Sequence, residues 1–322
     1  MGRRKKGLDT SGWVILDKPL EMTSTQAVGK IKWLFNANKA GHAGTLDPLA
    51  TGLLPIALGE ATKTVPFVMD GEKVYRFTVT FGCETNTDDA EGTVIQRSDH
   101  RPGTREIEDA LPAFTGDILQ VPPAFSAIKV QGERAYDIAR AGEDVVLEPR
   151  PISIHALDLI DRPDADTLIL EAECGKGTYV RALARDLART LGTVAHVTAL
   201  RRLSVGPFGE EDMISLAMID DLRHKTPDFT ELAFKGAFDD ILLPIETALD
   251  DIPALAVDKK DAVRLKRGQS VLLRGRDAPL ICDTVSVSSG GSLIALGEVY
   301  KGLLKPKRIF NLATDIPQVS TG

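Results

Sequence analysis

The stretch Gly41-His42-Ala43-Gly44-Thr45-Leu46-Asp47-Pro48-Leu49-Ala50-Thr51-Gly52 decides how the rest of this chain is interpreted. Three glycines and a proline in twelve residues predict an irregular loop, not a regular helix or a central strand. An apolar run, Leu53–Leu58, follows directly. Asp47 precedes a proline, so its backbone is pushed to the extended region, and its carboxylate is well placed to be desolvated and aimed. On spacing alone, an Asp-Pro turn whose side chain bonds its own backbone is favoured.

Length and composition predict a two-domain globular protein. A chain of 322 residues exceeds the usual single-domain size, and we place the boundary between residues 1–250 and 251–322. No apolar run is long enough to span a bilayer, and the basic N-terminus lacks the apolar continuation of a secretory signal. The cysteines, Cys83, Cys174 and Cys282, lie far apart without metal-type spacing. A protein of the reduced cytoplasm without structural disulfides is therefore expected.

The net charge of −7 argues at first sight against a nucleic-acid substrate, but the uneven distribution of the charge weakens that argument. Residues 1–39 carry 8 Lys+Arg against 3 Asp+Glu, and residues 262–322 carry 9 against 4. Residues 210–261, in contrast, carry 5 against 14. Because salt screens charges beyond about 10 Å, RNA responds to the local field and not to the total. The charge pattern therefore permits RNA binding without demonstrating it.

Hydrophobic periodicity predicts strands and helices in alternation over the first part of the chain. Residues 13–17 read as a short buried strand. Ser24 is expected to be the N-cap of a helix that runs to Phe35. A helix is expected over 60–69, and strict alternation of side chains predicts a strand over 74–81.

The middle of the chain predicts a hairpin, two long strands, a helix and a further strand. The acids of 84–92 suggest a metal loop, but the EF-hand spacing is absent, and a hairpin loop is the better interpretation. Residues 152–160 and 167–174 read as strands. A glycine-rich turn then leads into a helix over 178–190, and 194–205 is again strand-like.

The segment 120–150 is unlike its surroundings, because prolines bound it and basic residues lie between them. Two interpretations stand side by side. One is a lid or RNA clamp, and the other is an ordinary hairpin plus helix with a solvated basic face. The residues concerned are Lys129, Arg134, Tyr136, Arg140 and Arg150.

The last third of the chain predicts an acidic, helical connection and a small β-rich unit. After Phe208 the chain is acidic and is expected to be helical to about Asp240. Residues 255–316 show short apolar runs between glycines, typical of short strands. This unit resembles the PUA domain, a small RNA-binding barrel, most clearly at Ala295-Leu296-Gly297-Glu298-Val299.

Several motifs together resemble the TruB family of pseudouridine synthases. They are Gly41–Gly52, Gly12-Trp13-Val14-Ile15-Leu16-Asp17-Lys18-Pro19, Tyr75, Lys176-Gly177-Thr178-Tyr179-Val180-Arg181 and Leu200-Arg201-Arg202-Leu203, in the family's order and spacing. The resemblance implies an α+β pseudouridine synthase fold with a central mixed, largely antiparallel sheet and a C-terminal PUA-like β-barrel. It also implies isomerisation of uridine 55 in the TΨC arm of tRNA, with 120–150 as a thumb that grips the arm.

The resemblance assigns roles to particular residues. Asp47 would be the carboxylate that acts at C1′ of the uridine, and Arg181 the cation that keeps it ionised when water is withdrawn. Tyr75 would stack on the flipped base and accept a sugar proton, and Tyr179 would contact the extruded nucleotide. Without the resemblance, Arg181 reads as a surface arginine and both tyrosines as core aromatics.

His42, Leu200 and Lys18 complete the implied substrate-binding set. His42 would fill the space that the flipped base leaves, and Leu200 would line the uracil pocket. Lys18 would support the catalytic loop rather than react. From the residues alone, His42 reads as a polar loop residue and Leu200 as part of the core.

Three classes of function remain to be compared. The first is a tRNA pseudouridine synthase, the second a non-catalytic RNA-binding or tRNA-folding protein, and the third another RNA-modifying enzyme, such as a methyltransferase. Asp47 with Arg181 favours the first, because binding alone gives no reason to keep a carboxylate facing phosphates. The dinucleotide, phosphate-loop and zinc motifs are absent, so neither a cofactor nor a metal is expected. The expected partner is tRNA, bound by a monomer without a membrane or a protein partner.

Overall fold

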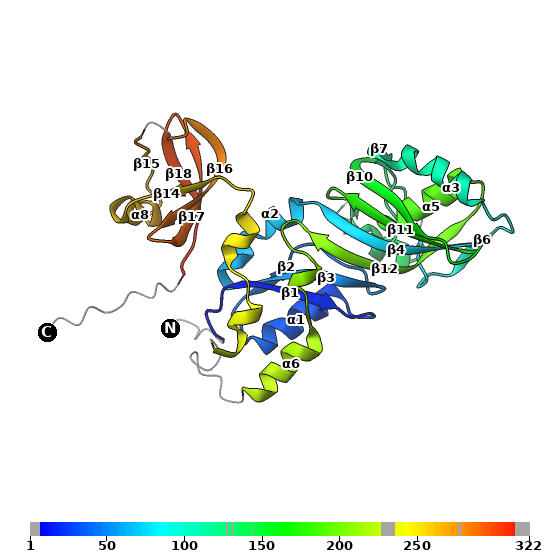
Figure 1. The fold of residues 1–322 in the computed structure, drawn as a ribbon, viewed down its shortest axis with the longest axis horizontal. Helices are drawn as coiled ribbons and strands as arrows, with labels where there is room; N and C mark the ends of the chain where they lie inside the picture. Colours follow the sequence, from blue (N-terminus) through cyan, green and yellow to red (C-terminus); the bar gives the residue numbers. More distant parts are fainter. Residues whose placement is uncertain are drawn as a thin grey trace.

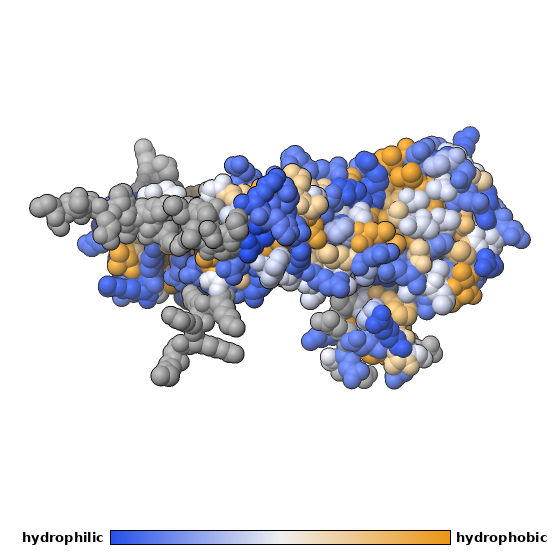
Figure 2. All heavy atoms as spheres, turned by 90° about the horizontal axis from the view of Figure 1, so that it is seen from below, coloured by the Kyte–Doolittle hydropathy of each residue, from blue (hydrophilic) through white to orange (hydrophobic). Residues whose placement is uncertain are grey.

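The computed structural model of the chain describes residues 7–126, 128–130, 132–143, 145–226, 236–275 and 278–312. Figure 1 shows a large sheet surrounded by helices and, at the other end of the molecule, a small separate sheet. The α+β class is therefore confirmed. No helix in these ranges is long and apolar enough to cross a membrane. The face seen in Figure 2 is mostly hydrophilic, with apolar residues in scattered groups.

The large sheet is mixed and mostly antiparallel, as expected. Within the described residues its strands follow the order β13-β1-β3-β12-β4-β11-β10-β7, and β2 pairs with β3. The β1–β13 and β12–β3 pairs are parallel, while β1–β3, β12–β4 and β11–β4 are antiparallel. These strands are β1 (Gly12–Lys18), β2 (Ala40–His42), β3 (Ala50–Leu58), β4 (Lys73–Phe81), β7 (Gly116–Gln120), β10 (Arg150–Asp161), β11 (Thr167–Cys174), β12 (Ala195–Val205) and β13 (Ile214–Ser215). The sheet thus places the late strand β12 between the early strands β3 and β4.

Two helices pack on this sheet with the faces that their sequences predict. Helix α1 (Ser24–Leu34) buries Ala27 and Ile31, one turn apart. Helix α5 (Val180–Thr190) buries Leu183 in the same way. Such spacing gives one apolar stripe. Both stripes belong to the main core, together with inward side chains of β3, β4 and β11, so the start of α5 is held against the middle of the sheet.

The start of α1 differs from the prediction by one residue. Thr23 is the N-cap: its hydroxyl accepts the Gln26 backbone N–H, and the Gln26 side chain accepts the Thr23 N–H. Ser24 is buried instead, and its Oγ donates to the Leu46 carbonyl (3.0 Å) and accepts the Leu46 N–H (2.8 Å). Serine and threonine are both good caps, so the contact with Leu46 decides between them.

The stretch Gly41–Gly52 is a loop only in its middle, and the prediction of a loop throughout was wrong. Strand β2 ends at His42, and the central strand β3 begins at Ala50. Strand β3 can include Gly52 because its φ of 92° is open to glycine. A larger residue would not fit, since a Cβ there would lie 2.3 Å from the Arg202 carbonyl oxygen.

The helix predicted over 60–69 is broken in two. The 3-10 helix η1 (Gly59–Lys63) is followed by α2 (Val65–Asp70), with Thr64 between them. Pro66 lies in the first turn of α2, where its missing N–H is tolerated. A continuous helix would need that N–H for a bond to the preceding turn, so the break falls before the proline.

The predicted hairpin at 84–92 is confirmed, since it joins β5 (Cys83–Thr85) to β6 (Val94–Arg97) in an antiparallel pair. The segment 120–150 contains a short antiparallel pair and a short helix. These elements are β8 (Lys129–Val130), β9 (Glu133–Arg134) and α4 (Ala135–Arg140). The remaining helices of the large part include α3 (Thr104–Ala110) and α6 (Leu216–Lys225). Residues 227–235, in the acidic region predicted to be helical, lie outside the described residues.

The C-terminal sheet is small and strongly curled, which confirms a separate β-rich unit. Its strand order is β14-β16-β17-β18-β15. The elements are β14 (Ala254–Ala256), α8 (Lys259–Lys266), β15 (Val271–Leu272), β16 (Ile281–Ser289), β17 (Ser292–Tyr300) and β18 (Leu303–Ile309). Phe310 packs in one apolar cluster with Trp13 and Phe208 of the large part. Lys63 also donates to the Ile309 carbonyl at 2.7 Å, so the two parts share an apolar and a polar contact.

Candidate active site

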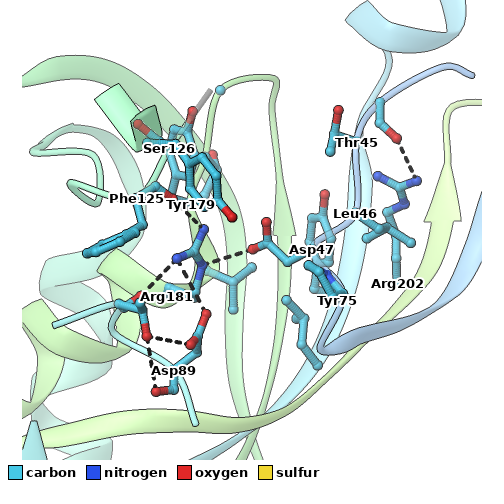
Figure 3. Close-up of a pocket in the computed structure, with 18 of the residues that line it drawn as sticks. Thr45, Leu46, Asp47, Tyr75, Asp89, Phe125, Ser126, Tyr179, Arg181 and Arg202 are labelled. Carbon is cyan, nitrogen blue, oxygen red and sulfur yellow. Dashed lines mark hydrogen bonds and ion pairs between the residues drawn. The ribbon is translucent and has the colours of Figure 1, made fainter. Parts of the chain in front are cut away.

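A cavity of about 850 Å³ lies on the large sheet, where segments far apart in sequence meet. Its volume is in the range of sites that enclose a small ligand. Figure 3 shows its walls. They come from the loop before β3, strand β4, the β5–β6 hairpin, segment 120–150, the start of α5 and strand β12. Of the residues singled out from the sequence, Asp47, Tyr75, Tyr179, Arg181 and Leu200 line this cavity.

Asp47 and Arg181 form an ion pair at the centre of the cavity (Figure 3). The Arg181 Nε lies 2.9 Å from the Asp47 Oδ2. The Arg181 side chain is 7% exposed, whereas that of Asp47 is 37% exposed. The guanidinium is thus buried behind a carboxylate that still faces the cavity. This arrangement holds the carboxylate at the cavity through an ion pair with a buried cation.

The guanidinium of Arg181 is fixed by further partners. Its Nη1 donates to the Thr87 carbonyl (2.8 Å) and lies 3.4 Å from the Asp89 Oδ2, and its Nη2 donates to the Phe125 carbonyl (3.1 Å). These partners come from the β5–β6 hairpin and from segment 120–150. Since an arginine fork has a rigid plane, contacts on several sides fix its direction as well as its position.

Lys18 supports the loop that carries Asp47 by binding backbone carbonyls. Lys18 is fully buried, and its Nζ donates to the carbonyls of Pro19, Met22 and Pro48, the last at 3.4 Å. Burial lowers the pKa of Lys18 to about 8, although nearby Asp47 opposes this. Lys18 does not line the cavity, and its position fits the supporting role predicted for it.

Arg202 also binds backbone carbonyls next to Asp47, on both sides of it in sequence. Its Nε donates to the Leu53 carbonyl (2.7 Å) and its Nη2 to the Gly44 carbonyl (3.2 Å). Gly44 has a φ of 100°, and a Cβ there would lie 3.3 Å from the Arg202 Nη1. The backbone conformation therefore favours glycine at this position, and a side chain there would also press on the arginine. Arg202 also lines the cavity, opposite Tyr75 in the β12–β4 register.

Apolar and aromatic side chains form the other walls. Tyr75 projects from β4, and Leu200, which is 7% exposed, pairs with Phe77 and Ala50 on the adjacent strands. Tyr179 is the N-cap residue of α5, and the Gln120 side chain bonds both its N–H (2.9 Å) and its carbonyl (3.2 Å). Burial raises the pKa of both tyrosines, so they present neutral hydroxyls at neutral pH.

His42, like Lys18, lies outside the cavity that the other predicted site residues line. It sits on β2 opposite Ile56 and does not line the cavity. Its Nδ1 is buried and has no hydrogen-bond partner among the described residues. Burial, and next the charge of Arg202, lower the pKa of His42, so the ring is neutral at neutral pH.

Several charged residues that line the cavity received no role from the sequence, Arg202 and Asp89 among them. Arg202 was part of a recognised motif, and Asp89 was one of the acids of the predicted hairpin loop. A signal for Asp89 exists, because α5 carries arginines at 181, 185 and 189, four residues apart and thus on one face. Such a face needs acidic partners if it is buried. No cluster of His, Cys, Asp and Glu in the described residues has the geometry of a metal site.

The arrangement can hold a flat ring against aromatic and aliphatic walls with one carboxylate directed at it. A carboxylate of this kind can add to an electrophilic carbon or stabilise positive charge next to it. The guanidinium, which has partners on several sides, directs the carboxylate into the cavity. The groups around the cavity thus suit chemistry on a base or sugar that has been brought out of a stack.

Comparisons with known proteins agree with this geometry. The model of the "TruB family pseudouridylate synthase (N terminal domain)" matches residues 32–180, and that of the "tRNA pseudouridylate synthase B C-terminal domain" matches 181–250. A Bradyrhizobium diazoefficiens protein named tRNA pseudouridine synthase B is 62% identical over 309 residues, 96% of this chain and 88% of its own length. One of the same name from Agrobacterium fabrum is 54% identical, covering 96% and 97% of the two chains.

Solved structures show the same fold. The Cbf5 chain of a Cbf5-Nop10-Gar1 complex aligns with a TM-score of 0.69 at 25% identity, covering 93% of this chain and 85% of that one. The archaeal box H/ACA sRNP Nop10-Cbf5 complex gives 0.70 at 22% identity, covering 97% and 93%. With these relatives, the matched family models and the site geometry together, this chain belongs to the TruB family of pseudouridylate synthases.

Proposed function

We propose that this enzyme converts uridine 55 in the TΨC arm of tRNA to pseudouridine. The relatives that cover nearly the whole chain are named for tRNA pseudouridine synthesis. The observation that carries the proposal is the ion pair of Asp47 with buried Arg181, whose carboxylate remains open to the cavity. A non-catalytic RNA-binding protein would gain nothing from a carboxylate held there, because it would repel phosphates.

The reaction needs no added group, since it is an isomerisation. The bond from C1′ to N1 of uracil breaks, the base turns, and a bond from C1′ to C5 forms. The proton lost from C5 is balanced by the one gained at N1. Asp47 acts at C1′, either by adding to it or by stabilising its positive charge. Arg181 keeps Asp47 ionised, and no cofactor takes part.

The base must first leave its stack, which costs a few kcal/mol. Tyr75 stacks on the extruded uracil, and because burial raises its pKa the hydroxyl stays protonated and does not serve as the base for a sugar proton. Tyr179 contacts the nucleotide, and Leu200 lines the side of the pocket. Stacking on an aromatic ring returns about 1–3 kcal/mol per base. His42, beside the loop, fills the space that the base leaves.

The substrate is bound by more than the cavity. Segment 120–150 contributes Tyr136 and Arg140 to the cavity wall, which supports a role as an RNA clamp. Residues 1–250 form the catalytic domain and residues 251–322 an RNA-binding, PUA-like domain. The enzyme works as a monomer, with tRNA as its partner.

Substitution of Asp47 by asparagine tests the function. The purified protein is incubated with unmodified tRNA and no cofactor, and pseudouridine is mapped by carbodiimide reactivity. Wild-type protein should modify uridine 55. Asp47→Asn should bind tRNA and form no product, while the exposed Asp109→Asn on α3 should behave as wild type. Turnover by Asp47→Asn would remove Asp47 from its role, and tRNA binding without product by the wild type would favour the non-catalytic alternative.

A further inference from the structure

Three arginines on one face of α5 pair with three acids of the β5–β6 hairpin, one helical turn apart. Arg181 lies beside Asp89, Arg185 contacts Asp88, and Arg189 contacts Glu84. The inner pair belongs to the site described above. The outer arginine is half exposed, with 56% of its side chain accessible. The middle pair, Arg185 with Asp88, is neither in the cavity nor at the surface.

Arg185 repeats the contacts of Arg181 one turn further along the helix. Its Nη1 lies 2.9 Å from the Asp88 Oδ2, and its Nη2 donates to the Val121 carbonyl at 2.8 Å. Arg181 likewise binds the hairpin and a carbonyl of segment 120–150, that of Phe125. Each arginine therefore joins α5 to the same two segments. Asp186 completes the set of partners of Arg185, at 2.9 Å from its Nε.

Asp88 is held in an unusual state. Its side chain is 8% exposed, and its φ of 62° lies in the left-handed region. Its backbone carbonyl accepts the Val197 N–H of β12 at 3.0 Å. Burial raises the pKa of Asp88 to about 6. The positive charges of Arg185 and Arg181 oppose this rise, and the negative charge of Glu84 adds to it. A buried acid with a strained backbone next to a reactive centre indicates a positioning role.

We propose that Arg185 and Asp88 form a positioning pair, which fixes the β5–β6 hairpin and the start of segment 120–150 so that Arg181 can hold Asp47. The Thr87 carbonyl and Asp89, which fix the Arg181 guanidinium, flank Asp88 in sequence. A shift of Asp88 therefore moves both partners of Arg181. Neither member of the pair lines the cavity, and both side chains are buried, so neither is placed to contact a base bound there. The inference rests on the proposed function of the same site.

Asp88→Asn is the sharpest test, because asparagine has the same shape and also tolerates the left-handed backbone. We expect single-turnover pseudouridine formation on unmodified tRNA to fall by about 10- to 100-fold, as for a misplaced reactive group. The dissociation constant for tRNA should stay unchanged. Glu84→Gln is the matched control: it removes a charge from the same hairpin opposite the same helix face, and its rate should match the wild type.

The double variant Asp88→Asn with Arg185→Gln separates positioning from general stability. If the two residues act as a unit, the double variant loses no more rate than the more damaging single one. Should Asp88→Asn fail to fold, Arg185→Lys, which keeps the charge but cannot reach all three partners, should show the same selective loss of rate. Unchanged rates in these variants, or an equal loss in Glu84→Gln, would overturn the inference. An inactive wild type would instead overturn the proposed function.

Discussion

Asp47 is set apart from the neighbouring acid by its exposure. Its side chain is 37% exposed, whereas that of Asp89, beside the same guanidinium, is 3% exposed. Asp89 thus balances the charge of Arg181 from within the protein, and Asp47 meets the cavity. In the proposed reaction, one arginine between two carboxylates would leave the outer one free to change partner as positive charge develops at C1′. Of the two, Asp47 is therefore the one that can act on a substrate.

The lowered pKa of Lys18 predicts that the activity depends on pH. Its pKa is lowered to about 8, so its ammonium loses a proton as the pH rises through that value. The remaining amine has two N–H groups for the carbonyls of Pro19, Met22 and Pro48, and it no longer attracts Asp47. We therefore expect kcat to fall between about pH 7.5 and 9, with a midpoint near 8, in a pH–rate profile.

The effect on stability has the opposite sign. A lowered pKa means that the folded state releases this proton before the unfolded state does, so the contribution of Lys18 to stability rises with pH from about 8 towards 10.5. Loss of kcat at pH 8 to 9 should therefore occur without weakening of the fold by this group. Lys18→Met should be slow and lack this limb. A wild-type profile that stays flat, or a Lys18→Met profile with the same fall, would contradict the explanation.

At the scale of elements, the start of α1 supports the catalytic loop. Ser24→Ala would leave the buried N–H and carbonyl of Leu46 without their partner, at a cost of about 1–3 kcal/mol. We expect kcat to fall at least about tenfold as well, since the loop carries Asp47. Thr23→Ala removes the cap of the same helix but no loop contact, so it should cost about 1 kcal/mol and leave kcat unchanged.

Denaturant unfolding and single-turnover rates, measured side by side, check this pair of variants. The two substitutions are adjacent and remove the same kind of hydroxyl, but only Thr23→Ala removes the cap of the helix. A rate loss in Thr23→Ala equal to that in Ser24→Ala would show that helix stability alone governs the site. An unchanged rate in Ser24→Ala would show that the loop holds its position without this contact.

The elements also show what the sequence could and could not predict. Alternation of side chains located β4, because successive side chains of a strand point to opposite faces of the sheet. The loop at Gly41–Gly52 was predicted too long, since glycine in a strand depends on a close neighbour, here Arg202, that no local pattern reveals. Asp89 was missed for a similar reason. An acid in a hairpin reads as solvated until the helix that buries it is known.

At the scale of the whole molecule, exposed cations lie far from the cavity as well as near it. In Figure 1, α8 of the C-terminal sheet lies at the opposite end of the molecule from α5. Lys259, Lys260, Lys266 and Arg267, on or next to α8, are exposed. A base bound at Asp47 lies far from these cations, so they would contact other parts of the proposed tRNA substrate.

Lys266→Gln should therefore weaken the binding of whole tRNA and leave kcat unchanged. Each phosphate contact that is lost lowers the slope of log K against log salt by about one, so the slope for whole tRNA should flatten by that amount. If α8 binds phosphates outside the TΨC arm, the KM of an isolated TΨC stem-loop should not change. Arg105→Gln removes a cation whose side chain is 93% exposed on α3 of the catalytic part and serves as the control. Equal effects of Lys266→Gln on stem-loop and whole tRNA would place α8 near the arm itself, and no effect on either would leave RNA binding to the catalytic part alone.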